Sequence, residues 1–166
     1  SLENAEDDLN QAWKDLKNHD ITSKDSVIGI SASGRTPYVV GGLKDSKNNN
    51  LFTGLITSNN DSKASIYANI VVETILGSEV VTGSTRMKSG TAQKLILNMI
   101  STCLMIKLGK IKGNKMVDMK LSNSKLLDRG TRFIADELNI TYDDAKKILK
   151  KYNSVRKAIS QYKKKE

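Results

Sequence analysis

The N-terminal segment of the chain carries apolar residues at helical spacing. They form one stripe over residues 4–18 and consist of Ala5, Leu9, Ala12, Trp13 and Leu16. Such a stripe is typical of an amphipathic helix, so we expect a single helix over residues 4–18. On this helix Glu6 would lie about 20° from Trp13 at 100° per residue. We therefore expect the Glu6 carboxylate to be half-buried at the edge of the stripe.

Three mostly apolar runs follow, each short enough to be a β-strand. They cover residues 27–31, 51–57 and 70–75. A helix opening at Thr36 and Pro37 separates the first two runs, and a short helix over residues 63–68 separates the last two. The first run is apolar and continuous, as expected for a strand covered on both faces. The alternating order predicts an α/β fold, namely an αβα sandwich with a partial parallel sheet and right-handed crossovers.

A long helix is expected from about Thr91 to Leu108. Its apolar residues occupy most of the circumference, which is typical of a helix at the centre of a fold or in a subunit interface. Cys103 lies in this helix and is expected to be a small core residue. It is the only cysteine and cannot form an internal disulfide. The sequence has no cysteine and histidine cluster with metal-ligand spacing, so we expect no metal site.

Two further helices are expected toward the C-terminus. One covers residues 124–138, and the other runs from Tyr142 onward with Thr141 as its N-cap. We therefore divide the chain into an αβα portion over residues 1–112 and a C-terminal helical part over residues 113–166.

Positive charge is concentrated at the C-terminal end. The 166 residues carry a formal net charge of +9, and residues 141–166 hold nine basic side chains against three acidic ones. Aromatic residues are sparse in this tail. A solvated helix face is the simpler interpretation, and contact with nucleic acid or an acidic lipid surface is the alternative. We expect no nucleic-acid partner and no membrane partner.

Export signals are not evident in the sequence. The N-terminus lacks a signal-peptide pattern, and polar residues interrupt the longest apolar stretch, residues 95–108. We therefore expect a cytoplasmic protein.

The segment of residues 29–36, GISASGRT, lies between a predicted strand and a predicted helix. Its small residues would let backbone N–H groups approach an anion, and the helix N-terminus adds partial positive charge. Ser31, Ser33 and Thr36 supply hydroxyl donors. The segment lacks the lysine of a nucleotide phosphate loop and the three glycines of a dinucleotide fingerprint. It favours a small phosphorylated ligand, and a tight serine-rich turn is the alternative.

Three stretches carry a family resemblance. They read ENAED, GISASGRTPYVVGGL and GSEVVTGSTRMKSGTAQKLILNMISTCLMIKLGK. Together they resemble the N-acetylmuramic acid 6-phosphate etherases of the sugar isomerase (SIS) superfamily, over nearly the whole chain. The resemblance implies a carbon–oxygen lyase of peptidoglycan recycling that works as a homodimer without a cofactor. Its substrate would be N-acetylmuramic acid 6-phosphate, and its products N-acetylglucosamine 6-phosphate and D-lactate.

The resemblance also implies roles for residues of the phosphate segment and the ENAED motif. The sugar phosphate would be held by Ser31, Ser33, Gly34, Arg35 and Thr36. Glu6 matches the second glutamate of the family's EGAED motif, in which Asn4 replaces the glycine. Elimination of lactate and hydration of the product each need a positioned acid and a base, and Glu6 is the implied catalytic residue.

A second group of candidates lies before the long helix. In related sugar isomerases a glutamate at the start of a similar loop acts on the sugar, which implies that Glu79 lies near the substrate. Ser84 and Thr85 would add hydroxyl groups suited to an anionic ligand. A surface loop with helix capping is the alternative for this group.

The family pattern includes two features that this sequence lacks. They are a GTSGR loop and a second catalytic glutamate, both preceding the ENAED motif. We therefore expect residues 1–166 to be the C-terminal portion of a longer etherase, inactive by itself. The main alternative is a non-catalytic sugar-phosphate-binding module, of the kind found in glucokinase regulatory protein.

Overall fold

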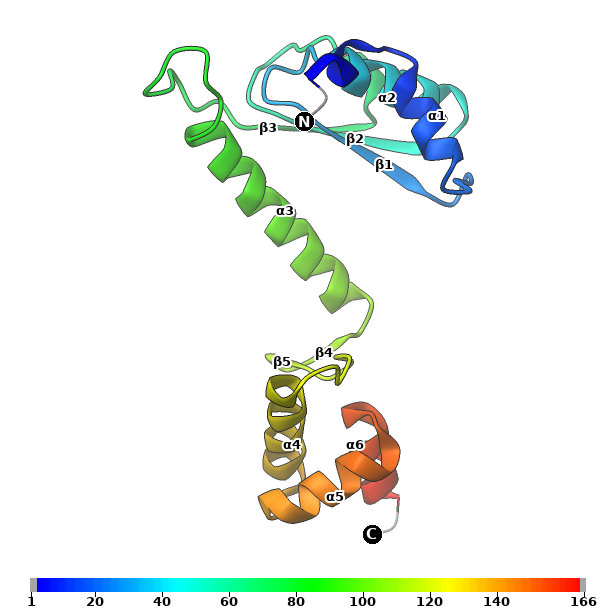
Figure 1. The fold of residues 1–166 in the computed structure, drawn as a ribbon, viewed down its shortest axis with the longest axis vertical. Coiled ribbons are helices and arrows are strands. Elements are labelled where there is room, and N and C mark those ends of the chain that lie inside the picture. The colour runs from blue at the N-terminus through cyan, green and yellow to red at the C-terminus, as the bar shows by residue number, and fades with distance from the viewer. Residues whose placement is uncertain (1–2, 165–166) are drawn as a thin grey trace. The chain divides into compact units, whose positions relative to one another are not determined.

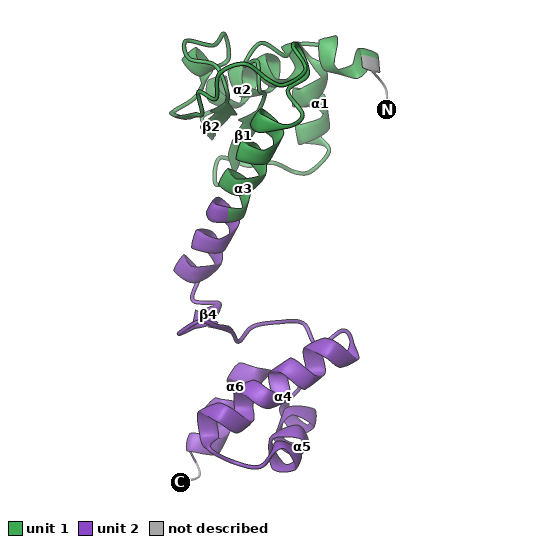
Figure 2. Ribbon diagram, turned by 90° about the vertical axis from the view of Figure 1, so that its left-hand side faces the viewer, with its two compact units in different colours: residues 1–98 green, residues 99–166 purple. Residues whose placement is uncertain are grey.

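The computed structural model describes residues 3–164, and Figure 1 shows the order of their elements. The chain divides into two compact units, a first unit of residues 1–98 and a second unit of residues 99–166 (Figure 2). Helix α3 (Lys88–Lys107) runs across this division. Within residues 3–164, no helix is long and apolar enough to cross a membrane.

The first unit is built on a parallel sheet, as the sequence predicts. Its strands are β1 (Ser26–Ile30), β2 (Phe52–Thr57) and β3 (Ile70–Glu73). They lie in the order β1-β2-β3, and Leu55 of β2 is in register with Gly29 and Val71 on either side. Since all three strands run in the same direction, their carboxyl ends lie at one edge of the sheet. The α/β prediction is confirmed.

Helices α1 (Gln11–Lys17) and α2 (Pro37–Asn48) lie on the same side of this sheet (Figure 1). Leu43 of α2 and Leu55 of β2 are almost fully buried in the core between helix and sheet. Burial of a side chain of this size stabilises the fold by about 2 kcal/mol. The helix approaches β1 so closely that a Cβ added to Gly29 would lie 2.8 Å from a side-chain atom of Leu43.

The N-terminal segment is not one helix, so that prediction is wrong. Residues Glu3–Asp7 form a separate 3₁₀-helix, η1, before α1 begins. The Asp8 carboxylate accepts the Asn10 N–H at 2.7 Å and stabilises the turn between them. The Leu9 backbone then passes against α2, where a Cβ on Gly41 would lie 1.7 Å from its carbonyl oxygen. This long-range contact bends the chain where helical spacing predicted continuity.

The opposite face of the sheet is only partly covered by described residues. Ile56 in the middle of that face is buried, whereas the surrounding apolar side chains are 40–56% exposed. These are Ile28, Ile30, Phe52 and Ile70. The prediction that residues 27–31 form a strand covered on both faces is therefore wrong, because Ile28 and Ile30 are exposed on this face and α2 packs on the other one.

Short elements complete the first unit. The predicted helix over residues 63–68 is a single 3₁₀ turn, η2 (Ser65–Tyr67), between β2 and β3. Helix α3 begins at Lys88, earlier than predicted. Most of its apolar side chains are exposed, including Leu95 and Met99. Cys103 is exposed as well, so its predicted place in a core is wrong.

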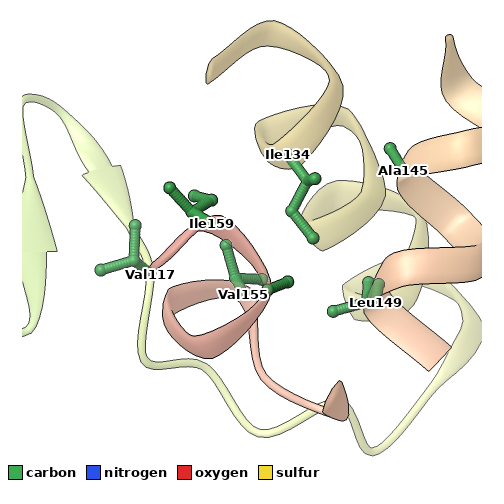
Figure 3. Packing of buried hydrophobic residues seen from close by; sticks show 7 residues of the cluster. Val117, Ile134, Ala145, Leu149, Val155 and Ile159 are labelled. Carbon is green, nitrogen blue, oxygen red and sulfur yellow. The ribbon is translucent and has the colours of Figure 1, made fainter. Parts of the chain in front are cut away.

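The second unit is a small hairpin followed by helices. The hairpin strands are β4 (Ile111–Lys112) and β5 (Lys115–Met116), joined through Gly113 at φ +58°. The helices are α4 (Ser124–Leu138), α5 (Tyr142–Tyr152) and α6 (Val155–Lys163). Figure 3 shows Ile134, Leu149 and Val155 of these three helices in one buried cluster. The predicted helix over residues 124–138 is confirmed.

The predicted last helix is interrupted. Thr141 caps α5 as expected, because its hydroxyl accepts the Asp144 N–H at 3.2 Å. Asn153 then adopts a left-handed conformation at φ +45° and ends α5, and Ser154 caps α6 by accepting the Lys157 N–H. The tail is therefore two helices.

Several basic side chains of this region have acidic partners. Lys163 lies 2.8 Å from Glu137, and Arg156 lies 2.7 Å from Asp118. These ion pairs neutralise part of the positive charge of this region.

Candidate functional site

The loop after β1 closes into a compact cluster of hydroxyl and N–H groups. The Ser31 hydroxyl lies 3.0 Å from the Thr36 hydroxyl and 3.4 Å from the Ser33 hydroxyl. It also accepts the Gly34 N–H at 3.0 Å, and the Ser33 hydroxyl accepts the Arg35 N–H at 3.2 Å. The structure thus brings the five predicted phosphate ligands together. We call residues 31–36 the cradle.

The cradle lies at the N-terminus of α2. Thr36 precedes the helix, but its side chain makes no capping hydrogen bond and pairs with Ser31 instead. Pro37 has no N–H group, and the next N–H groups of a first helical turn have no partner within the helix. With the partial positive charge of the helix end, this arrangement suits an anion. The exposed side chain of Arg35 adds a full positive charge beside it.

A second loop, residues 58–64 after β2, supports the cradle. The N–H groups of Ser58 and Ala64 donate to the carbonyl oxygens of Ala32 and Gly34, both at 3.0 Å. The Asn59 side-chain amide donates to the Ser33 carbonyl at 3.2 Å. Both loops follow adjacent parallel strands, which is where α/β sheets bind ligands. No function was predicted for this segment from the sequence, although its position after β2 was the available signal.

Ser62 of the second loop lies directly beneath the cradle. Its hydroxyl is buried and has no hydrogen-bond partner. Among the described residues it is the one buried side-chain polar atom in this situation. Gly34 above it has φ +64°, a conformation that favours glycine. The contact between the loops is therefore tight as well as hydrogen-bonded.

Glu6 lies on η1, and its side chain is exposed rather than half-buried as predicted. The reason is the break between η1 and α1, which removes Glu6 from the apolar stripe of the expected helix. Glu6 lines a shallow pocket of about 340 Å³ together with Ala5, Gln11, Asp15 and Tyr38. Tyr38 belongs to the first turn of α2, two residues after the cradle. The pocket therefore reaches the same helix end that carries the cradle.

Asp15 organises the polar side of this pocket. One of its carboxylate oxygens accepts the Tyr38 hydroxyl at 2.9 Å, and the other accepts the Gln11 side-chain amide at 2.7 Å. The hydrogen bond to Asp15 raises the pKa of Tyr38, so the phenol stays protonated at neutral pH. Neither Tyr38 nor Asp15 was a candidate from the sequence, because their pairing joins residues 23 positions apart.

Glu79 caps the N-terminus of α3. Its two carboxylate oxygens accept the N–H groups of Lys88 and Ser89, each at 3.0 Å. These backbone hydrogen bonds lower the pKa of Glu79. The Lys88 ammonium group donates to the Ser78 carbonyl and holds the same loop from the other side. The N-terminus of α3 thus already faces a carboxylate from its own chain.

The remaining predicted residues lie in the loop before α3. The Ser84 N–H donates to the Val81 carbonyl at 3.0 Å, and the Thr85 carbonyl accepts the Gly90 N–H at 3.1 Å. In the described part of the chain, no hydrogen bond connects Glu79, Ser84 or Thr85 to the cradle. No cluster of histidine, cysteine, aspartate and glutamate suited to a metal ion occurs within residues 3–164.

The parallel sheet, the cradle at the end of β1 and the supporting loop after β2 define an α/β protein with a candidate anion site at its strand ends. Comparison with known proteins then shows that the chain is homologous to N-acetylmuramic acid 6-phosphate etherases. No family model matches the chain.

Three such etherases illustrate the similarity. The protein of Christiangramia forsetii is 57% identical over 163 residues, which are 98% of this chain and 60% of that protein. The Bacteroides thetaiotaomicron protein is 54% identical over 97% of this chain and 58% of its own length. The Porphyromonas gingivalis protein is 52% identical over 99% of this chain and 60% of its own length. The chain thus spans about 60% of the length of these relatives.

Proposed function

We propose that this protein cleaves the D-lactyl ether of N-acetylmuramic acid 6-phosphate, giving N-acetylglucosamine 6-phosphate and D-lactate in peptidoglycan recycling. The observation that carries the proposal is the 57% identity to an etherase over nearly the whole chain. The hydrogen-bonded cradle supports it, since its geometry suits the phosphate of such a sugar.

In this proposal the cradle binds the 6-phosphate. The hydroxyl groups of Ser31, Ser33 and Thr36 can turn toward the phosphate oxygens, and the Gly34 N–H lies in the same cluster. Arg35 contributes a positive charge. Hydrogen bonds from its guanidinium group to phosphate would be stronger than hydrogen bonds between neutral groups. The anchored phosphate would hold the sugar at the end of α2, beside the pocket that contains Glu6.

The chemistry assigned to Glu6 is proton transfer. A base removes the proton at C2 of the open-chain sugar, the electron pair forms a double bond to C3, and lactate leaves from C3 with a proton from an acid. Water then adds at C3, and a proton returns to C2. Glu6 supplies one carboxylate for these steps, and a bound sugar over the pocket would shield it from water. The family pattern supplies a second glutamate upstream of the matching stretch.

Glu79, Ser84 and Thr85 remain proposed substrate-binding residues. The capping contacts of Glu79 support a role in shaping its loop. The reaction requires no cofactor, because the aldehyde of the open-chain sugar itself acidifies the C2 proton. We further propose a cytoplasmic homodimer, which the exposed apolar side chains of α3 support.

The test is release of D-lactate from N-acetylmuramic acid 6-phosphate by the intact gene product. In water enriched in ¹⁸O, elimination and hydration predict one solvent oxygen at C3 of the sugar product and none in the lactate. Sugar-phosphate binding without lactate release would instead favour the non-catalytic binding module.

A further inference from the structure

The pocket beside Glu6 has a wall made of hydrogen-bond acceptors. We call Glu6, Gln11, Asp15 and Tyr38 the acceptor pocket. Asp15 receives the Tyr38 hydroxyl hydrogen and a Gln11 amide hydrogen. Tyr38 therefore presents the lone pairs of its oxygen, and Gln11 keeps its carbonyl oxygen together with its second amide hydrogen. Glu6 adds two carboxylate oxygens.

The charges of this pocket select against anions. Glu6 and Asp15 bring two carboxylates, and the described lining holds no lysine or arginine. A phosphate or a lactyl carboxylate placed here would be repelled, whereas an uncharged group with N–H or O–H donors would find several acceptors. The cradle has the opposite character, with the hydroxyl groups of Ser31, Ser33 and Thr36, the N-terminal end of α2 and the Arg35 charge. A ligand that is anionic at one end and carries hydrogen-bond donors at the other would therefore suit the cradle and the acceptor pocket together.

We propose that the acceptor pocket recognises the hydrogen-bond donor at C2 of the sugar, the acetamido N–H in the proposed substrate. In this arrangement Asp15 is a positioning residue that orients Tyr38 and Gln11 toward that donor. The inference rests on the proposed function, because it takes the phosphate in the cradle as the anchor of the sugar. Recognition at C2 also places the carbon that loses its proton next to Glu6.

The experiment compares ligands that differ only in their donor at C2. Dissociation constants are measured for glucose 6-phosphate, which has a C2 hydroxyl, and 2-deoxyglucose 6-phosphate, which has no donor there. N-acetylglucosamine 6-phosphate tests the acetamido group, and inorganic phosphate reports on the cradle alone. We expect the intact gene product to prefer both C2 donors over the deoxy sugar by about tenfold, since two or more acceptors converge on that position.

Three variants test the residues, and one provides the control. Tyr38→Phe, Gln11→Leu and Asp15→Asn should each reduce the preference for a C2 donor about fivefold while inorganic phosphate binds as before. Asp15→Asn should also raise KM more than it lowers kcat, as expected for a residue that orients others. Tyr67→Phe removes a phenol hydroxyl elsewhere in the first unit and should leave the preference unchanged.

The outcomes separate this inference from the proposed function. If the variants still bind phosphate and keep the preference for a C2 donor within twofold of the wild type, the acceptor pocket does not recognise the C2 donor. The inference is then overturned, whatever the lactate assay shows. If the preference falls but lactate is never released, the pocket stands and the etherase proposal fails. If the wild type binds no sugar phosphate, both fail.

Discussion

Gly34 and Ser62 lie so close that a Cβ added to Gly34 would be 2.2 Å from the Cβ of Ser62. The two residues come from loops that follow neighbouring parallel strands. Gly34 also has φ +64°, which other residues adopt only at a cost. Space and backbone conformation therefore both require glycine at this point of the cradle.

Gly34→Ala should destabilise the first unit by about 2 kcal/mol or more, because left-handed strain of about 1 kcal/mol adds to the clash with Ser62. Inorganic phosphate should bind at least tenfold more weakly, since Gly34 shares hydrogen bonds with both loops. Urea unfolding and calorimetric titration measure the two effects.

Gly77→Ala is the matched control for this substitution. Gly77 has nearly the same φ, +68°, but nothing lies within 4 Å of its added Cβ. Gly77→Ala should therefore lower the free energy of unfolding only by the backbone strain, about 1 kcal/mol, and leave phosphate affinity unchanged. Equal effects of the two substitutions would contradict the role assigned to Ser62.

Glu6→Gln should lower the rate of D-lactate release by about 100-fold or more, because a positioned acid or base contributes that much to proton transfer. Inorganic phosphate affinity should stay the same, since Glu6 lies outside the cradle. Asp7→Asn alters the neighbouring exposed carboxylate and should retain activity. Full activity of Glu6→Gln would remove Glu6 from the mechanism.

Glu79 makes the N-terminus of α3 sensitive to acid. Its pKa is lowered in the folded protein by the N–H groups of Lys88 and Ser89. A depressed folded pKa means that the stabilisation is present above the unfolded pKa and is lost as the pH falls through the folded one. Wild type should therefore exceed Glu79→Gln in stability at about pH 7 and approach it at about pH 3, as measured by urea unfolding. A difference independent of pH would show that the Glu79 charge is not the cause.

We expect a similar pH dependence of stability in the second unit, from Glu137. Hydrogen bonds from Lys112 and Lys163 lower the pKa of Glu137 to about 2. The contribution of ionised Glu137 to the free energy of unfolding should therefore be complete at neutral pH. It should decline as the pH falls from the ordinary glutamate pKa of about 4.3 to about 2. Glu137→Gln should therefore differ most from wild type above this interval, differ less within it and unfold like wild type below it. High salt should reduce the difference, because the ion pairs are solvent-exposed.

Local patterns predicted the elements whose causes are local. The apolar runs located β1 and β2 to within one residue, and the helix expected over residues 124–138 is α4. The break after η1 was missed because it depends on Leu9 meeting Gly41, a contact 32 positions away in sequence. The exposed face of the sheet was missed for a related reason. Hydrophobicity shows which side chains avoid water, whereas it does not show which element covers them.

The same distinction applies to the site. The cradle could be predicted because its small residues and the following Pro37 are consecutive in the chain. Its support from Asn59 and Ala64 depends on the parallel register of two strands, and the Asp15–Tyr38 pair depends on the packing of α1 against α2. Such pairings have no signature in a single sequence. The roles assigned to the cradle residues and to Glu6, Glu79, Ser84 and Thr85 stay predictions.

The contact between Leu9 and Gly41 has a mechanical consequence. It fastens η1, and Glu6 with it, to the same helix whose first turn follows the cradle. The cradle is hydrogen-bonded to β2 and to the loop after it, so a shift of α2 against the sheet would move Glu6 while most of the anion site stays with the strand ends. The distance between phosphate and acid therefore depends on how α2 is seated on the sheet.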